Sequence, residues 1–250
     1  MEFDNKYLIA QLCDSKKLED FKVLLDFYRF LSNIFYKTKD YNLYQIKLQW
    51  LLDTLFADKE NGAAEVDKFK ILMHKYGFDS AKIIKMIESK TADMDNFPFK
   101  SIEDSLKYID NTDGIFWQLY AEMLFGKLRD NEGQSISNMA KSFGIMEMLK
   151  FAEFKKSRGV YVLLFSAEDL KDVAAAEGKN IKYLVSIAKG YIKESSKNKG
   201  RLRKLLLLNY FSADFFSCLE SARFNIDNPA INNVRKLTYL KIVLALIFRM

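Results

Sequence analysis

The stretch LEDFKVLLDFYRFLSNIFYK, residues 18–37, decides the fold class of this chain. Its apolar residues recur every three or four positions, which is the period of one face of an amphipathic α-helix. A second segment with helical spacing follows over residues 41–56, after a short polar break. The two segments together predict an all-α protein. The expected apolar faces consist of Phe21, Leu24, Leu25, Tyr28, Leu31 and Phe35 in the first segment and Leu43, Ile46, Trp50 and Leu51 in the second.

The rest of the chain continues this pattern of helix-length segments. Only 2 prolines and 10 glycines are present, too few for the many turns of an all-β fold. Ser80 and Ser101 are expected N-caps, and the S-x-x-D pattern at Ser166 predicts another helix start. The segment 205–219 is apolar on nearly all sides, which predicts a central helix. Further helices are expected over 65–76, 80–89, 101–111, 114–126, 133–155, 180–193, 200–223 and 230–249, with an extended or irregular segment over 156–164.

The amino-acid composition excludes several classes of protein. The chain has 250 residues, of which 49% are apolar and 29% charged, so it is neither disordered nor a multi-span membrane protein. With no internal repeat or linker, one domain over residues 1–250 is expected. The single His74 excludes a His-rich metal site, and Cys13 and Cys218 fit neither a zinc site nor a disulfide framework. We therefore expect no metal site.

The net charge of +6 is mild and spread along the chain, so no nucleic-acid partner is expected. The densest basic stretch, 197–204, predicts a solvated helix start or a contact with an acidic lipid surface. Residues 237–248 are mostly apolar but fall short of the roughly 20 residues of a membrane span. They predict a buried terminal helix, with a membrane-surface anchor or a partner-docking helix as the alternatives. The acidic N-terminus predicts neither a secretory signal nor a transit peptide.

Several segments, taken in order, resemble the squalene/phytoene synthase family of head-to-head prenyl transferases. They are FKVLLDFYRFLSNIF (21–35), IKLQWLLDTL (46–55), YIDNTDGIFWQLYAEMLFG (108–126), MAKSFGIMEMLKFAEFKKSRGVYVLL (139–164) and the tail over 182–239. The resemblance covers nearly the whole chain. It implies an all-α isoprenoid-synthase bundle around a central cavity.

In active members of that family, two facing helices each carry carboxylates at four-residue spacing, which places them on one helix face. The carboxylates hold Mg²⁺, and the metal holds the substrate diphosphates. Neither motif is acidic here, so the resemblance implies lost catalysis and no cofactor, with Mg²⁺ needed only if the chain is an active enzyme. The first motif aligns with Ser32, Asn33 and Tyr36, and the second with Phe151, Phe154 and Lys155.

Three residues match family positions that line the pocket or follow the second motif. They are Arg29, Tyr108 and Arg158, and Tyr108 and Arg158 are equally expected as structural hydrogen-bonding residues. Other acids near the motifs are expected to serve turns and caps rather than a metal. These are Asp93 and Asp95 in a loop, and Asp110 and Asp113 beside Gly114. Trp50, Trp117 and Glu122 are expected at the edge of the core.

The resemblance implies a non-catalytic scaffold or assembly factor. SFGIMEMLKFAEFKKSR (142–158) is similar to a eukaryotic branch that assembles respiratory complex I at the mitochondrial inner membrane. The acidic N-terminus suggests a bacterial counterpart, cytoplasmic or peripheral on the inner membrane face, whose partner is a protein or the membrane surface. The alternatives are a divergent transferase joining two farnesyl or geranylgeranyl diphosphates and a carrier of an isoprenoid or lipid. In each case residues 32–36 and 151–155 are expected around a shared cleft.

Overall fold

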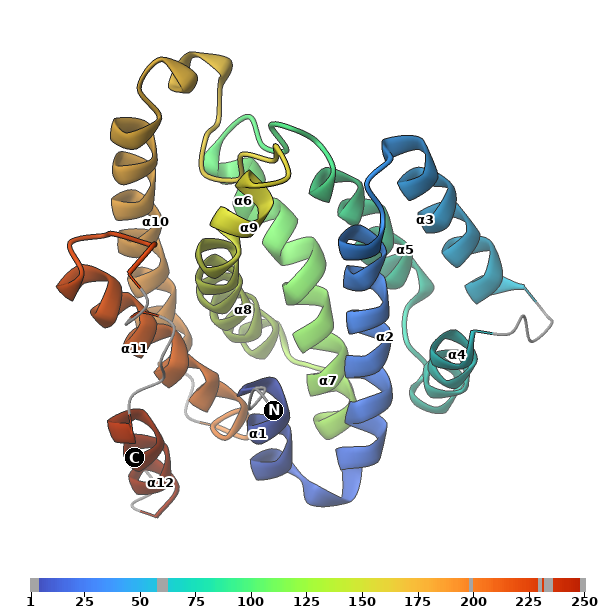
Figure 1. The fold of residues 1–250 in the computed structure, drawn as a ribbon. Helices are drawn as coiled ribbons and strands as arrows, with labels where there is room; N and C mark the ends of the chain where they lie inside the picture. Colours follow the sequence, from blue (N-terminus) through green and yellow to red (C-terminus); the bar gives the residue numbers. More distant parts are fainter. Residues whose placement is uncertain (1–4, 58–62, 198–199, 229–230, 232–235, 248–250) are drawn as a thin grey trace.

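Helix α2, Leu18–Lys37, is a long helix near the middle of the molecule and packs beside α7, Ile115–Phe125 (Figure 1). The computed structural model describes residues 5–57, 63–197, 200–228, 231 and 236–247. This part of the chain forms a single helical bundle without strands, which confirms the prediction of an all-α protein. All six apolar positions expected on α2 are buried. Phe21 packs against Tyr120 of α7 with ring centroids 4.5 Å apart, which joins the two helices.

The other helices surround this pair. The α-helices are α1 Asn5–Cys13, α3 Tyr41–Phe56, α4 Ala64–Tyr76, α5 Ser80–Ser89, α6 Ile102–Ile109, α8 Asp130–Lys150, α9 Ala152–Lys156, α10 Val173–Ser195, α11 Leu208–Ser221 and α12 Lys236–Ile247. Short helical turns are η1 Ser15–Lys17, η2 Lys90–Asp93, η3 Asp110–Gly114, η4 Ala167–Asp172 and η5 Leu205–Leu207. The third of these, η3, is a π-helix that continues α6 into α7.

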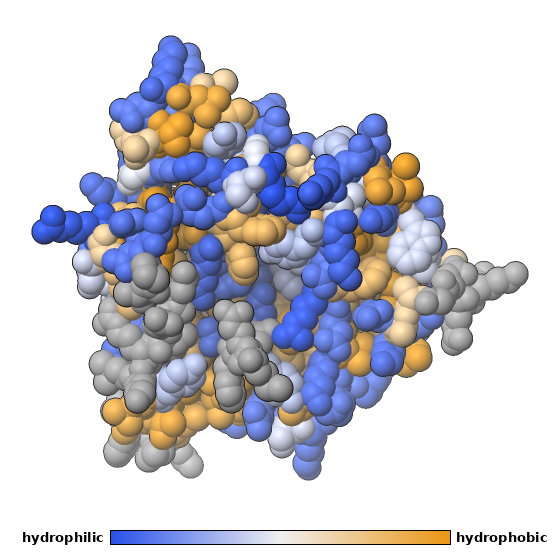
Figure 2. All heavy atoms as spheres, viewed as in Figure 1, coloured by the Kyte–Doolittle hydropathy of each residue, from blue (hydrophilic) through white to orange (hydrophobic). Residues whose placement is uncertain are grey.

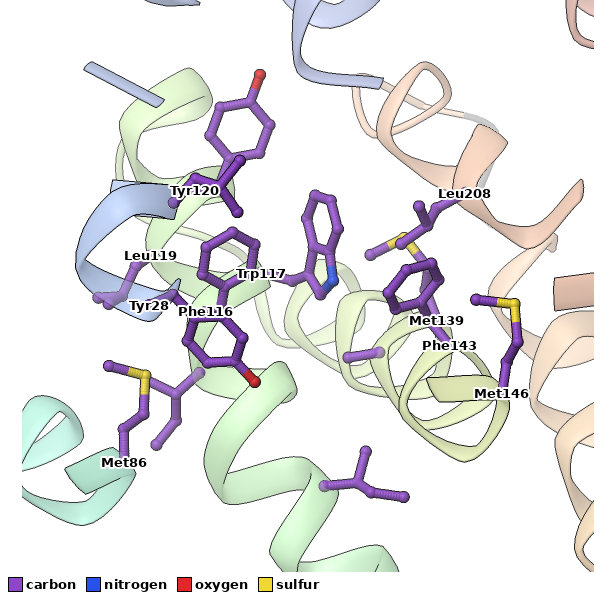
Figure 3. Packing of buried hydrophobic residues seen from close by; sticks show 14 of the residues in the cluster. Tyr28, Met86, Phe116, Trp117, Leu119, Tyr120, Met139, Phe143, Met146 and Leu208 are labelled. Carbon is purple, nitrogen blue, oxygen red and sulfur yellow. The ribbon is translucent and has the colours of Figure 1, made fainter. Parts of the chain in front are cut away.

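The centre of the core lies between α7 and α8, where Figure 3 shows Trp117 surrounded by aromatic and sulfur-containing side chains. Trp117 is fully buried and meets Phe116 and Phe143 edge to face. The prediction that Trp117 lies at the core edge is therefore wrong. The prediction of a central helix over 205–219 is also wrong, because α11 lies on the flank of the bundle (Figure 1). Its apolar residues pack on two sides, against α8 and against α12.

Helix α3 has the predicted bounds but not the predicted buried face. Leu43, Ile46 and Trp50 are 46%, 63% and 41% exposed. Leu51 is the one predicted residue of this face that is buried, together with Tyr44, Leu48, Thr54 and Leu55, which were not predicted. Tyr44 sets this orientation, because its hydroxyl donates to the carbonyl oxygen of Lys90 at 2.7 Å inside the bundle.

The structure confirms one of the predicted helix starts and corrects the others. Ser101 is confirmed as an N-cap, since its Oγ accepts from the Asp104 amide at 3.0 Å. The N-cap of α5 is Asp79 rather than Ser80, because the Asp79 carboxylate accepts from the Ala81 amide. Ser166 makes no side-chain cap and begins only the short turn η4. The predicted helix over 133–155 is divided at Phe151, where the backbone leaves helical geometry, into α8 and α9.

The C-terminal helix α12 is only half buried. Its Thr238, Ile242 and Ala245 are buried, and Tyr239 meets Phe211 of α11 at 6.0 Å. Its opposite face exposes Leu240, Val243 and Leu244, so a fully buried terminal helix is not found. Residues 230, 232–235 and 248–249 of the predicted helix lie outside the described residues. Across the described ranges, no helix combines the length and apolar character that a membrane crossing needs.

The basic stretch 197–204 lies largely at the surface, where its two arginines bind neighbouring elements. Arg201 forms an ion pair with Glu132 at 2.7 Å and donates to the carbonyl oxygens of Phe125 and Lys127. Arg203 donates to the carbonyl oxygen of Ala245, which attaches α12. The predicted solvent exposure holds for Lys197, Arg201 and Lys204, but residues 201–204 form turns rather than the start of a helix, and Lys199 lies outside the described residues.

Candidate functional site

A cleft of about 140 Å³ lies where the two segments that the resemblance aligns with the acidic motifs meet. Ser32 and Tyr36, one helical turn apart on α2, line one side, and Phe151 and Lys155 line the other. The ring of Tyr36 lies 5.3 Å from that of Phe154, which joins the two sides at the mouth. The expectation that residues 32–36 and 151–155 surround a shared cleft is thus confirmed.

A buried carboxylate, Asp93, organises one end of this cleft. Lys155 Nζ and the Tyr108 hydroxyl each lie 2.6 Å from its Oδ1, and Lys90 Nζ lies 3.4 Å from its Oδ2. Burial by itself would raise the pKa of Asp93, but Lys155 and Lys90 outweigh burial and lower it below the ordinary value. The prediction that Asp93 serves only a loop turn is wrong, because it accepts hydrogen bonds from Tyr108 and Lys155 and forms an ion pair with Lys90.

A second charged group, Lys6 with Asp113, lines the same cleft. Lys6 Nζ is 3.5 Å from Asp113 Oδ1 and 4.9 Å from the centre of the Tyr28 ring. Burial, and then the nearby Asp113 carboxylate, raise the pKa of Tyr28 well above its ordinary value. Tyr28 therefore stays a neutral hydroxyl at physiological pH. Asp113 is brought here by the π-helix η3, whose extra residue per turn directs it toward the cleft.

Asp110, at the start of the same π-helix, takes part in other contacts. Its Oδ1 accepts from Ser137 Oγ at 2.7 Å and its Oδ2 lies 2.9 Å from Lys141 Nζ, both on α8. Asp110 and Asp113 therefore bind different lysines and do not form a paired carboxylate site. The prediction that they serve turns is wrong, since both join helices through ion pairs.

The cleft as a whole is balanced in charge. Its lining includes three lysines, Lys6, Lys90 and Lys155, and three carboxylates, Asp93, Asp113 and Glu147. Within the described ranges, no group of three or more His, Cys, Asp and Glu side chains could hold a metal ion. Lysine ammonium groups stand between the carboxylates and take up the oxygen lone pairs that a divalent cation would need. The arrangement can bind polar groups by hydrogen bonds and apolar groups on Phe35, Phe99 and Phe151.

Not every residue of the motifs faces this cleft. Arg29 and Asn33 line a separate groove toward α3 and α4, and Arg29 lies 3.6 Å from Asp26. Arg158 donates to the carbonyl oxygens of Phe35 and Thr38 at 2.8 and 2.5 Å, so it caps the end of α2 rather than lining the cleft. Of the three residues that the resemblance predicts at or near the pocket, Tyr108 alone lines the cleft.

Several residues that line the cleft are not predicted from the sequence. Lys6, Tyr28, Lys90 and Asp113 were not expected as site residues, although Tyr28 was assigned to the core. Lys90 and Asp93 are three positions apart at the end of a helical pattern, which is a weak sign of an ion pair. Nothing local marks Lys6, because its neighbours in space come from four other elements, α2, η3, α7 and α8. Glu122, expected at the core edge, pairs with Lys82 at 2.6 Å outside the cleft.

Comparisons with protein families, with curated proteins and with solved structures found no match to this chain. The squalene/phytoene synthase resemblance therefore stays a prediction that rests on the residues quoted for it.

Proposed function

We propose that this protein is a non-catalytic helical scaffold that acts through a binding partner. The observation that carries the proposal is the 2.6 Å ion pair between Lys155 and buried Asp93. Lys155 stands at a position where the family resemblance implies a metal-binding carboxylate. Here the position supplies a cation instead, and that cation is already held by an acid of the same chain.

The size of the cleft supports the same conclusion. The condensation that the resemblance implies would hold two prenyl diphosphates at once. Pockets for drug-sized ligands usually enclose about 300–1,000 Å³, whereas this cleft encloses about 140 Å³. Tyr36 and Phe151 line the cleft and are 40% and 42% exposed, so they stand where it opens to solvent, and Phe154 packs against Tyr36. A divergent transferase and a carrier of a full-length isoprenoid both need more room than this.

The test of lost catalysis is a diphosphate-release assay. Purified full-length protein is incubated with Mg²⁺ and radiolabelled farnesyl or geranylgeranyl diphosphate, and pyrophosphate and products are measured. We expect no release above the protein-free blank and no Mg²⁺-dependent binding. Turnover that disappears in Lys155→Met would overturn the proposal and support the transferase. A lipid that stays bound in native mass spectrometry would support the carrier instead.

The proposed partner is a protein or the membrane surface, and the assembly-factor resemblance points to respiratory complex I. Deleting the gene in the native host tests this part. We expect a lower level of assembled NADH dehydrogenase, measured by native gel electrophoresis and NADH oxidation, with recovery on complementation. Unchanged complex levels would exclude the complex I role.

A further inference from the structure

We propose that the groove between α2, α3 and α4 binds an acidic amphipathic helix of a partner protein. This proposal deepens the scaffold function proposed above and rests on it for the expectation of a partner. The groove, called here the α2–α4 groove, encloses about 670 Å³. Val23, Phe30 and Ile34 contribute its apolar side on α2, with Trp50 on α3 and Ala64 on α4.

The apolar surface continues beyond the groove along α3. Leu43 and Ile46 are exposed and lie seven and four positions before Trp50, on the same face of the helix. This row is about 10 Å long at the rise of an α-helix. In Figure 2 hydrophobic atoms reach the surface on the side where Figure 1 places α3 and α4. A small ligand inside the groove would leave this row in water, whereas a docked helix covers both.

The sequence of α3 shows why this face needs a partner. The helix carries one apolar face that packs in the core, through Tyr44, Leu48 and Leu51. Its second apolar row has no neighbouring element over it among the described residues, as the exposures of Leu43 and Ile46 show. A helix with apolar residues on two faces is typical of an element buried on both sides. An apolar row at i, i+3 and i+7 is also the spacing that another helix meets in groove binding.

The charged residues that line the α2–α4 groove form its rim, and their net charge favours an acidic occupant. Four cationic residues, Arg29, Lys37, Lys47 and Lys68, line the groove with two acids, Asp26 and Glu65. Four positive and two negative charges leave a net charge of +2 on these lining residues. Acidic side chains flanking the apolar face of a helix would meet this rim and gain specificity and association rate.

The depth of the groove favours a helix over a bilayer. Ile34 is buried at its floor, and α3 and α4 stand on either side. A flat lipid surface would touch the exposed row on α3 but could not reach a recessed floor. A partner helix about 10 Å wide, with apolar side chains that project from it, would contact both the exposed row on α3 and the floor of the groove.

Trp50 provides a direct readout, because the chain has two tryptophans and the other, Trp117, is fully buried. The probe is a synthetic amphipathic peptide of 16 residues, the length of α3, with leucine on one face and glutamate on the other. We expect a blue shift of the Trp50 emission and protection from iodide quenching. The Trp50→Phe variant should still bind, measured by anisotropy of a labelled peptide, but should lose the fluorescence change.

Charge reversal tests the rim. The double variant Lys37→Glu, Lys68→Glu should weaken peptide binding by about tenfold. The matched control, Lys107→Glu with Lys179→Glu on α6 and α10, makes the same change in net charge outside the groove and should bind like the original chain. A peptide with lysine in place of glutamate should bind more weakly than the acidic one. Equal binding of both peptides, or no binding of either, overturns the proposal.

Two further outcomes assign the groove to another occupant and also overturn the proposal. Protection of Trp50 by phosphatidylglycerol vesicles but not by the acidic peptide would mean a lipid surface. Concentration-dependent dimerisation in sedimentation velocity, lost in Ile46→Glu, would mean a second copy of the chain. The diphosphate-release assay is independent of these readouts, so a chain that releases diphosphate yet binds the peptide would refute the scaffold function alone.

Discussion

Lys155 Nζ lies 2.6 Å from Asp93 Oδ1, across 62 positions of sequence, and joins α9 to the short turn that follows α5. Both side chains are largely buried, so the ion pair is shielded from water. Removing one partner of such a pair leaves the other charge buried without full compensation. The pair therefore makes a clear prediction about stability.

We expect Lys155→Met to lower the free energy of unfolding by about 2–4 kcal/mol, because Asp93 would keep only Lys90 and Tyr108. Urea unfolding followed by circular dichroism measures this change. The double variant Lys155→Met, Asp93→Leu should recover part of the loss, since neither charge is then left alone. The exposed pair of Lys22 with Glu19 is the control, and Lys22→Met should leave the unfolding midpoint unchanged. Equal effects of Lys155→Met and Lys22→Met would contradict the prediction.

Glu132 gives a prediction about acid stability. Its hydrogen bonds to Arg201 lower the pKa of Glu132 from 4.5 to about 2. In the folded chain this carboxylate therefore stays ionised where the unfolded chain is already protonated. The resulting stability is present above about pH 4.5 and is lost as the pH falls toward 2. Glu132→Gln should flatten the pH dependence of the unfolding free energy in this window.

Urea titrations at half-unit pH steps would measure the slope for Glu132→Gln and the original chain. The exposed Glu168 on η4 provides the control for loss of one carboxylate. Glu168→Gln should keep the original slope. The prediction fails if both variants change the slope by the same amount.

Gly144 predicts a packing defect on α8. A Cβ at this position would lie 2.2 Å from Cγ2 of Ile109 on α6, closer than any real contact. Gly144→Ala should therefore destabilise the protein by about 1–3 kcal/mol through overpacking. Gly133 on the same helix has no atom within 4 Å of its would-be Cβ. Gly133→Ala should instead stabilise by about 0.5–1 kcal/mol, so thermal unfolding should move in opposite directions for the two variants.

Arg158 predicts the effect of losing a helix cap. Its guanidinium donates to the carbonyl oxygens of Phe35 and Thr38 and lies 4.5 Å from the centre of the Phe35 ring. Arg158→Ala should cost about 1–3 kcal/mol, because two carbonyls at the end of α2 lose their donor. Arg158→Lys should recover only part, since an ammonium cannot reproduce the planar two-point contact. Full recovery by lysine, in urea unfolding, would show that charge alone matters.

Local pattern was enough to predict the helices but not their faces. The bounds of α2, α3 and α5 follow from apolar spacing, which is a property of short segments. On α3 both Leu43–Ile46–Trp50 and Tyr44–Leu48–Leu51 have helical spacing, and the sequence alone does not say which row meets the core. The choice depends on Lys90, whose carbonyl receives the Tyr44 hydroxyl from 46 positions away.

The cleft was predictable only in part, for the same reason. The order of the altered motifs placed Ser32 and Tyr36 opposite Phe151 and Lys155, as the structure has them. Asp93, however, is one of several acids near a loop, and its role depends on partners that come from α6 and α9. Charged residues that are far apart in the sequence form no periodic pattern from which such a network could be predicted.

The short helix α9 and the turn after it hold two different parts of the bundle, through Lys155 to Asp93 and through Arg158 to the end of α2. A displacement of this segment must break both sets of contacts together. Amide hydrogens at the end of α2 and along residues 152–158 should therefore exchange as one cooperative unit. We therefore expect the cleft to open only when both sets of contacts break in the same event.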